Sequence, residues 1–420
     1  MTVNLVSLGC PKNLVDSEKI LGALGASDVA ISAFPEDSDI IIINTCGFIE
    51  PAIEETEAEI EKALQIVGSN TKKIYVYGCA VSRFGSQLKE KYPEVSAWFK
   101  LEQKKGLLKK ISAESVKIKS RMVTTQGYAY LKIAEGCSNH CSYCTIPSIR
   151  GDYRSFDFDE LIREAFELSK LGAKEIILIA QDTTRYGTDR YNKPMLVPLI
   201  REISKLIDIE WIRIMYAHPK TINQEIIDEI SHNKKVCKYI DLPIQHINDR
   251  ILHLMNRGVD RKKIEEILTQ LGEIKGISLR TTVITGFPTE TEDEFKELFE
   301  FLKTANFTWL GIFPYYRESD TKAGKLKPLP KSLAKKRYRQ VIMLQKNLIE
   351  KNNAKRIGKT YKTLIQSNNG HYIGHTEFDA PEIDGQVITK AKDLDIGRFY
   401  CLKIKGMKGA DLYAGTEDTE

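Results

Sequence analysis

Three closely spaced cysteines form the first group of residues in this 420-residue chain that could do chemistry. Cys137, Cys141 and Cys144 have the spacing C-x3-C-x2-C, and Pro147 and Gly151 follow them, so we expect a loop here. A loop can place three thiolates on one face of a metal cluster, and a 4Fe–4S cluster usually takes four cysteines. Three ligands would leave one iron open, and an open metal position is where a substrate or cofactor binds.

Free cysteines, a disulfide and a zinc site are the alternatives for this triplet. A disulfide leaves one cysteine over and suits a secreted protein, whereas the start of this chain shows no basic leader segment. Structural zinc takes four ligands. His140 could be the fourth, although its place between two ligands favours a solvated loop histidine.

A second set of three cysteines follows predicted strands within residues 1–112. Near-continuous apolar runs predict buried parallel strands at 3–8, 39–44 and 73–77. With a helix at 51–67, they indicate a doubly wound parallel sheet. Cys10, Cys46 and Cys79 each come after one of these strands, at the sheet edge where such folds bind ligands. We therefore expect a second metal site, and three buried packing cysteines are the alternative.

A polar, basic linker is expected at 113–127, and residues 128–324 then repeat a strand–helix pattern six times. Strands are predicted at 128–134, 175–180, 211–216, 238–242, 278–285 and 308–313. Helical patterns lie between them, for example at 157–171 and 260–275. Six units fall short of the eight of a closed barrel, and the family resemblance given below implies a partial (βα)6 barrel. The cysteine loop follows its first strand, at the end where such barrels keep their active sites.

The last hundred residues divide into a basic segment and a β-rich segment. Residues 325–356 carry eleven Lys or Arg and one acid, Glu350, which fits either a solvated helix or a contact with RNA phosphates. Residues 358–420 predict a small antiparallel β-barrel. Its strands are expected at 360–366, 372–376, 386–390 and 399–406.

The charge of the β-rich segment predicts its partner. It contains eight basic and ten acidic residues, and four of the acids lie close together: Glu377, Asp379, Glu382 and Asp384. We expect an acidic surface, which repels RNA and attracts a basic protein. Cys237 and Cys401 lie in or beside predicted strands and are expected to be packing residues.

The cysteine content and the apolar runs of the sequence predict the cellular compartment. Eight cysteines in a chain of this length, without a leader segment, indicate metal ligation in a reducing cytoplasm. No apolar run approaches eighteen residues, so no membrane-spanning helix is expected.

The cysteine loop resembles that of the radical S-adenosylmethionine (SAM) superfamily. The resemblance implies that Cys137, Cys141 and Cys144 hold a catalytic 4Fe–4S cluster whose open iron binds SAM, and that an electron from the cluster cleaves SAM to a radical. By the same likeness Tyr143 lies beside the adenine. Other cofactor contacts are expected at Arg150, Gln181, Asp182, Gln245 and Gly286.

The whole layout resembles the methylthiotransferase branch of that superfamily, with a TRAM-type β-domain. Within the branch, four segments are similar to the enzymes that modify ribosomal protein S-twelve: VSLGCPKNLVDSE at 6–18, NTCGFI at 44–49, IAQDTTRYG at 179–187 and DLPIQH at 241–246. Two departures are Ala-Val-Ser-Arg after Cys79, and Thr289 where a glycine is common.

The resemblance implies methylthiolation of the β-carbon of an aspartate in S-twelve. It also implies a second 4Fe–4S cluster at Cys10, Cys46 and Cys79, and an electron donor such as a ferredoxin or flavodoxin. Because residues 325–356 are basic, a contact with ribosomal RNA, if any, is expected there. Two alternatives stay open. One is a methylthiotransferase for a modified adenosine of tRNA, and the other is a non-catalytic iron–sulfur protein that transfers electrons or senses redox state.

Overall fold

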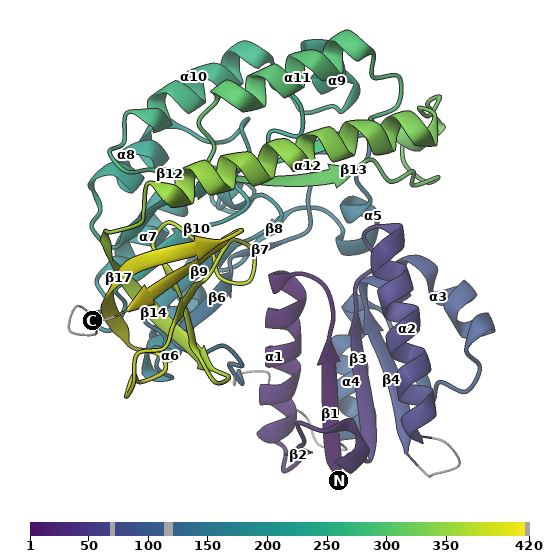
Figure 1. Cartoon of the computed structure of the whole chain (residues 1–420). Helices are drawn as coiled ribbons and strands as arrows, with labels where there is room; N and C mark the ends of the chain where they lie inside the picture. The colour runs from purple at the N-terminus through teal and green to yellow at the C-terminus, as the bar shows by residue number, and fades with distance from the viewer. Residues whose placement is uncertain (68–71, 113–120, 416–420) are drawn as a thin grey trace. The chain divides into compact units, whose positions relative to one another are not determined.

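The computed structural model describes residues 1–67, 72–112 and 121–415, which form two compact units (Figure 1). The first unit comprises residues 1–124, 135–138 and 144–153, and the second comprises 125–134, 139–143 and the chain from 154 onward. Most of the linker predicted at 113–127 lies outside the described residues.

A five-stranded parallel sheet organises the first unit, in the order β2-β1-β3-β4-β5. Its strands are β1 (Thr2–Ser7), β2 (Ala30–Ile31), β3 (Ile40–Thr45), β4 (Lys73–Gly78) and β5 (Ala97–Phe99). The helices of this unit are α1 (Pro11–Gly25), α2 (Glu50–Val67), α3 (Cys79–Lys91), α4 (Lys104–Ile111) and α5 (Ile146–Arg150). The predicted parallel sheet is confirmed. The sequence misses β2 and β5, because strands of two or three residues are too short to show a pattern.

A six-stranded parallel sheet organises the second unit, in the order β13-β12-β11-β10-β9-β6. The strands are β6 (Tyr128–Lys132), β9 (Glu175–Ile179), β10 (Trp211–Ile214), β11 (Val236–Asp241), β12 (Ser278–Thr285) and β13 (Trp309–Pro314), with the two-residue strands β7 (Ala134–Glu135) and β8 (Arg154–Ser155). The helices are α6 (Phe158–Lys170), α7 (Leu196–Ser204), α8 (Gln224–His232), α9 (Asp249–Leu254), α10 (Arg261–Gly272), α11 (Glu292–Thr304) and α12 (Lys331–Ala354). The sheet is open, so the predicted partial barrel is confirmed.

Helix starts in the second unit follow local chemistry. Asp157 accepts hydrogen bonds from two backbone N–H groups at the start of α6, and Thr291 and Glu294 form a reciprocal capping box at the start of α11. These caps satisfy donors that have no partner within the helix, so each helix begins at a fixed residue. Fixed helix starts in turn fix the loops that precede them at the carboxyl ends of the strands.

Residues 360–415 form a closed five-stranded barrel in the order β14-β15-β16-β18-β17. The strands are β14 (Thr360–Asn368), β15 (Tyr372–Thr376), β16 (Val387–Thr389), β17 (Phe399–Lys408) and β18 (Asp411–Gly415). The small barrel is confirmed, but the expectation of a purely antiparallel one is wrong, because β16 and β18 pair in parallel. A closed ring with an odd number of strands cannot alternate direction throughout, and the unpredicted fifth strand makes the number odd.

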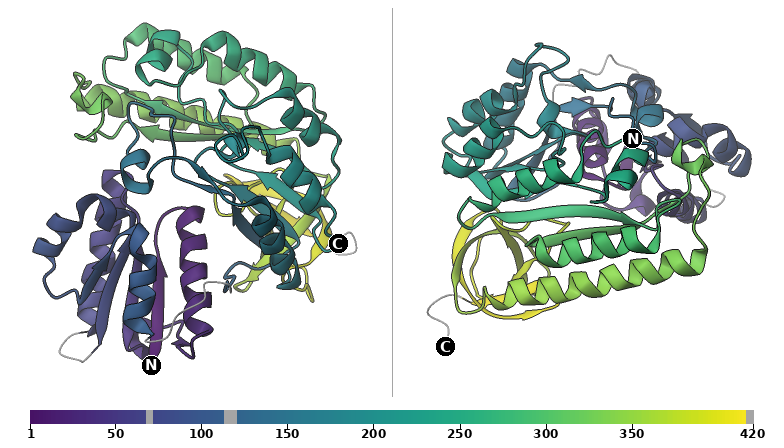
Figure 2. Two further views of the ribbon diagram at one scale, coloured as in Figure 1. Left: turned by 180° about the vertical axis from the view of Figure 1, so that it is seen from behind. Right: turned by 90° about the horizontal axis from the view of Figure 1, so that it is seen from above.

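The barrel packs against the amino ends of the central strands. Ser278 and Trp309, the first residues of β12 and β13, both donate to the carbonyl oxygen of Phe378, at 2.8 and 2.9 Å. Tyr128, the first residue of β6, donates to Glu382 at 2.9 Å. The view from above in Figure 2 shows the barrel as a ring next to this end of the sheet. The cysteine loop follows the opposite, carboxyl end of β6.

The acidic surface expected on the barrel is wrong. Each of the four acids contacts the central sheet or the end of the basic segment: Glu377 accepts from the backbone N–H of Lys238, Asp379 from Arg356, Glu382 from Tyr128, and Asp384 from Tyr239 and Arg280. Burial by itself would raise the pKa of Asp379, but the adjacent Arg356 guanidinium holds it below its usual value. Residues 358–415 carry eight exposed basic residues, against the exposed acids Glu382, Asp393 and Asp395 and the half-buried Glu377 and Asp411. The outward face of the barrel is therefore cationic.

Helix α12 forms most of the predicted basic segment and lies alongside β13 (Figure 1). Arg337 and Arg356 turn inward, where they pair with Glu290 and Asp379 at 2.6 Å each. The other nine basic side chains of residues 325–356 are exposed.

Two cysteines lie away from both triplets. Cys237 is buried as expected, whereas Cys401 is exposed on the outward face of β17, so the packing role predicted for it is wrong. Within the described ranges, no helix has the length and apolar character needed to cross a membrane.

Candidate functional site

The middle of the cysteine loop is anchored within the second unit. The backbone N–H of Ser142 donates to the carbonyl of Met255 at 3.0 Å, and the carbonyl of Ser142 accepts from Ala323 at 2.8 Å. Asn256 donates through its side chain to the carbonyl of His140 at 2.9 Å. His140 itself is exposed with a φ of 50°, as expected for a loop histidine. These bonds hold the backbone on both sides of Cys141.

A buried arginine contacts the central cysteine. Arg257 donates to the sulfur of Cys141 at 3.5 Å and to the carbonyl oxygen of Pro243 at 2.6 Å. Arg257 is only 5% exposed, so its charge acts at short range in a medium that screens it weakly. A cation at this distance stabilises a thiolate, which is the form that binds iron. No local sequence pattern indicates Arg257, because it lies more than a hundred positions from Cys141.

Cys137 and Cys144 belong to the first unit, while Cys141 belongs to the second. The backbone N–H of Cys137 donates to the carbonyl of Gly151 at 3.1 Å. Gly136 has a φ of 76°, and a Cβ there would lie 2.1 Å from the carbonyl oxygen of Asp152, so only glycine fits. The sulfur of Cys144 accepts from the backbone N–H of Ile146 at 3.5 Å, at the start of α5.

Asp182, a predicted cofactor contact, anchors the cysteine loop through its side chain. One carboxylate oxygen accepts from Asn139 at 2.9 Å, and the other accepts from Thr184 and Thr221 at 3.0 and 3.1 Å. Asp182 is fully buried. The carboxylate therefore joins the loops after β9 and β10 to the cysteine loop.

The other predicted cofactor contacts in this unit lie at the carboxyl ends of the strands. Tyr143 packs against an apolar cluster that includes Phe287 and Ile284. Gln245 has a φ of 70°, and its backbone bonds to Thr282 and Ile284 of β12. Gly286 has a φ of 73°, and a Cβ there would lie 2.9 Å from the Cβ of Ala334 in α12. Gln181 is partly buried at the end of β9.

The N-terminal triplet lies at the carboxyl edge of the first sheet. Cys10 is the N-cap of α1, Cys46 directly follows β3, and Cys79 is the first residue of α3. The positive ends of two helix dipoles thus face the same region, which favours an anionic group there. A Cβ on Gly9 would lie 2.7 Å from the Cβ of Cys46, so a glycine is needed for the close approach.

The donor set of this triplet suits an iron–sulfur cluster, because thiolates are the ligands such clusters take. Burial raises the pKa of Cys79 to about 12 and also raises that of Cys46. Thiols in such surroundings lose their protons only to a strongly bound metal, so cluster binding at this edge would release protons.

Arg150, predicted to contact the cofactor, is the last residue of α5, and its guanidinium is buried within the first unit. It donates to the sulfur of Cys79 at 3.3 Å and to the carboxylate of Glu135 at 2.8 Å. No local sequence pattern indicates this contact, because Arg150 and Cys79 are far apart in the chain.

Three family models match the chain in order. They are uncharacterized protein family UPF0004 over residues 2–100, the radical SAM superfamily over 131–302 and the TRAM domain over 357–416. The radical SAM methyltransferase TsrM from Kitasatospora setae, solved with cobalamin and a 4Fe–4S cluster, shares the fold with a TM-score of 0.55 at 14% identity, covering 81% of this chain and 84% of that one. The cobalamin-dependent SAM radical enzyme OxsB has a TM-score of 0.53 at 15% identity, covering 83% and 56%. The fold and the matched models define a radical SAM enzyme, which takes a 4Fe–4S cluster and SAM.

Relatives called ribosomal protein uS12 methylthiotransferase RimO match almost the whole chain. The relative from Acetivibrio thermocellus is 42% identical over 98% of this chain and 97% of its own length. That from Aquifex aeolicus is 40% identical over 100% and 98%, and that from Clostridium kluyveri 44% identical over 98% and 97%. The chain belongs to the RimO family of radical SAM methylthiotransferases.

Proposed function

We propose that this protein transfers a methylthio group to the β-carbon of an aspartate in ribosomal protein uS12, the S-twelve protein of the small subunit. The observation that carries the proposal is the match over nearly full length with RimO relatives at about 40% identity. The carbon to be modified carries an unactivated C–H bond, which two-electron acid–base chemistry does not readily break. A radical initiator is therefore needed, and this class of enzyme supplies one.

Cys137, Cys141 and Cys144 are the proposed ligands of the cluster that acts on SAM. When bound, that cluster supplies the electron for reductive cleavage of SAM. Arg257 holds positive charge against the sulfur of Cys141, and Asp182 fixes the loop through Asn139. A ferredoxin or flavodoxin is the proposed electron donor.

For the SAM contacts, we propose two different roles for the predicted residues. We assign direct contact to Tyr143, Gln181, Gln245 and Gly286, which lie at or after the carboxyl ends of strands. Both oxygens of Asp182 already accept bonds from protein groups, so we assign it to holding the loop.

Cys10, Cys46 and Cys79 are the proposed ligands of a second 4Fe–4S cluster that holds or donates the inserted sulfur. The support is the donor set, the helix N-termini at Cys10 and Cys79, and the close approach at Gly9. Three ligands again leave one iron open, and an open iron can bind an exogenous sulfur.

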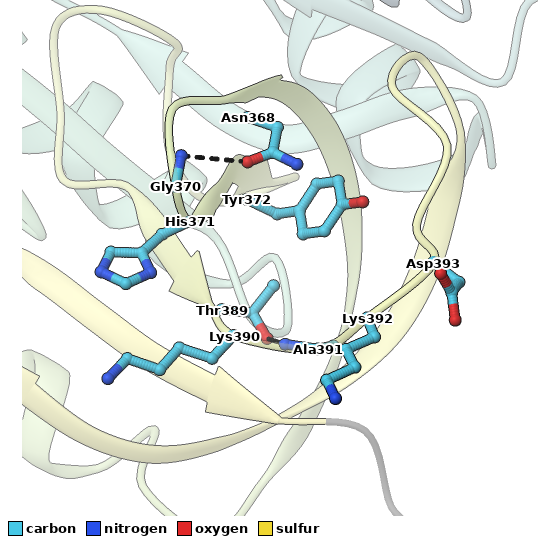
Figure 3. Close-up of a pocket in the computed structure, with 9 residues that line it drawn as sticks. All are labelled: Asn368, Gly370, His371, Tyr372, Thr389, Lys390, Ala391, Lys392 and Asp393. Carbon is cyan, nitrogen blue, oxygen red and sulfur yellow. Dashed lines mark hydrogen bonds between the residues drawn. The ribbon is translucent and has the colours of Figure 1, made fainter.

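The cationic face of the barrel is the proposed contact with ribosomal RNA, beside the exposed basic side chains of α12. A pocket of about 470 Å³ lies on the barrel between the β14–β15 turn and the end of β16 (Figure 3). His371, Tyr372, Lys390 and Lys392 are among its lining residues. Lysines neutralise phosphates and aromatic rings stack on bases, so the lining suits an unpaired nucleotide.

This contact would lie far from the chemistry. The barrel is at the amino ends of the central strands, and the eight residues of β12 span about 25 Å at roughly 3.3 Å per residue. A contact far from the active site suits a substrate presented on a large particle such as the ribosome, and we propose that the protein acts in the cytoplasm.

One experiment tests the function against its rivals. Reconstituted enzyme is incubated with SAM, reductant and a sulfide source, and with either purified uS12 or bulk tRNA, and both products are analysed by mass spectrometry. We expect a methylthio adduct on one aspartate of uS12 and none on tRNA adenosine. Modified tRNA with untouched uS12 would decide for the tRNA enzyme, and SAM left uncleaved would decide for an electron carrier.

A matched pair of variants tests the RNA contact. Lys390→Glu with Lys392→Glu should weaken binding to ribosomal RNA and reduce its salt dependence, because two phosphate contacts are lost. The control is Lys262→Glu, an exposed lysine on α10. Equal binding of ribosomal RNA by both variants would show that these barrel lysines are not part of the RNA contact.

A further inference from the structure

The side chain of Arg150 is one of the most deeply buried cations of the first unit. Arg150 ends the short helix α5, and Gly151 then reverses the chain with a φ of 73°. The arginine lies six residues after Cys144, yet its side chain is only 2% exposed and points toward the N-terminal triplet rather than into solvent. A buried guanidinium is stable only where several acceptors surround it.

Four acceptors surround this guanidinium, and one of them is a sulfur. One terminal nitrogen donates to Glu135 at 2.8 Å and to Asp16 at 3.4 Å. The other donates to the amide oxygen of Asn13 and, at 3.3 Å, to the sulfur of Cys79. The two carboxylates hold the planar fork so that one edge faces the sulfur.

Asn13 also restricts the position of the Arg150 guanidinium. Its amide nitrogen donates to the carbonyl oxygens of Leu8 and Thr45 at 2.9 Å each, at the carboxyl ends of β1 and β3. The amide oxygen must then face Arg150. The position of the Arg150 side chain is therefore fixed, through Asn13, by the sheet edge that carries Cys10 and Cys46.

We propose that Arg150 is a positioning residue for the N-terminal cluster: its charge-assisted hydrogen bond to the sulfur of Cys79 holds the cluster and raises its reduction potential. The inference rests on the second cluster of the proposed function. Reducing an iron–sulfur cluster adds negative charge, and that charge spreads onto the ligand sulfurs. A cationic donor at one sulfur therefore stabilises the reduced state, and hydrogen bonds to sulfur are a known determinant of cluster potential.

The test measures potential rather than turnover. The parent is the full-length chain with Cys137→Ala, Cys141→Ala and Cys144→Ala, so that only the N-terminal cluster is observed. The variants Arg150→Gln, Arg150→Lys and Lys104→Gln are made in it, and reduced cluster is quantified by electron paramagnetic resonance in redox titrations. Lys104 is the matched control, because it pairs with the same Asp16 at 2.9 Å and, among the described residues, donates to no cysteine sulfur.

At the parent's midpoint, we expect Arg150→Gln to lower the ratio of reduced to oxidised cluster about tenfold, the usual effect of one charge-assisted hydrogen bond. The ratio for Arg150→Lys should lie between those of the parent and Arg150→Gln. Lys104→Gln should change the ratio by less than about twofold. Unchanged potential in Arg150→Gln at full iron content would overturn the proposal, as would an equal shift in Lys104→Gln.

Iron analysis and circular dichroism separate the remaining outcomes. If folded Arg150→Gln loses its iron, recovery of iron in Arg150→Lys supports the holding role, whereas loss in all three variants overturns it. A parent without iron would instead refute the second cluster itself, and that result is recognised before any arginine variant is made.

Discussion

Arg356 and Asp379 form a bidentate ion pair in the interior of the second unit. Their nitrogen–oxygen distances are 2.6 and 2.8 Å, and the Asp379 side chain is 1% exposed. By sequence, one belongs to a strongly basic segment and the other to a net acidic one. In the structure they neutralise each other beneath the barrel, and Thr376 adds a further hydrogen bond to Asp379.

We expect Asp379→Asn to destabilise the protein by roughly 3–5 kcal/mol, because Arg356 would remain buried with its charge uncompensated. Urea unfolding measures the loss. The control Asp393→Asn changes an exposed acid of the same barrel and should stay within about 0.5 kcal/mol of wild type. Similar small effects for both would mean that Asp379 is solvated.

Iron content tests the two triplets separately. Anaerobically reconstituted protein should hold about eight irons, and about four after either triplet is changed to alanine, since each set of three cysteines binds one cube. Cys401→Ala should leave iron unchanged, because Cys401 is exposed on β17. A triplet variant that retained the full complement would contradict the ligand assignment.

The two clusters should differ in chemistry. With Cys10, Cys46 and Cys79 changed to alanine, the protein should still release 5′-deoxyadenosine under reducing conditions but form no methylthio product. The loop-triplet variant should do neither. Chromatography of the nucleoside and mass spectrometry of uS12 give the two readouts. If the folded N-terminal variant released no 5′-deoxyadenosine, the proposed division would be wrong.

His218 should make stability fall in mild acid. Burial, followed by the charges of Arg257 and Lys220, lowers the pKa of His218 to about 2. Below pH 6.5 the unfolded chain binds a proton there that the folded chain does not, so stability drops by about 1.4 kcal/mol per pH unit. Urea unfolding at pH 8 and pH 5.5 should show a smaller drop in His218→Gln than in wild type, and no such change in the exposed-histidine control His253→Gln.

Thr289 should be a site of stored strain. Its φ of 67° lies in the left-handed region, which a β-branched residue rarely adopts. Thr289→Gly should therefore raise the free energy of unfolding by about 0.5–1 kcal/mol. Thr291→Ala, two residues further on, removes the α11 cap and should lower it by about 1 kcal/mol. Thermal unfolding that gave both changes the same sign would contradict this account.

Much of the fold could be predicted, because strand periodicity and cysteine spacing are local properties of a sequence. The apolar runs that became β3 and β4 identify the first sheet, and Cys46 and Cys79 mark its carboxyl edge. Long-range partners leave no local signal. Nothing near Cys141 indicates Arg257, and nothing near Cys79 indicates Arg150.

Charge was the least reliable guide. The sum over the barrel segment predicted an acidic surface, because it counts Asp379 and Asp384 equally with exposed residues. Both carboxylates are inside, so the sum describes an interface within the protein and the remaining face has the opposite sign. To predict the charge of this surface, one would need to know which acids pair with basic residues inside the protein, and composition does not give that.

Ring closure of the terminal barrel limits how it can recognise a protein. With β16 joined to β18 and β14 to β17, the ring leaves no open edge at which a foreign peptide could add as an extra strand. Donor-strand and β-augmentation modes, common among peptide-binding domains, are therefore closed to it. Selectivity at this domain must come from its turns and outward side chains. Swapping the 369–371 turn or the 390–393 segment, which lie outside the strands, should change the partner without disturbing the ring.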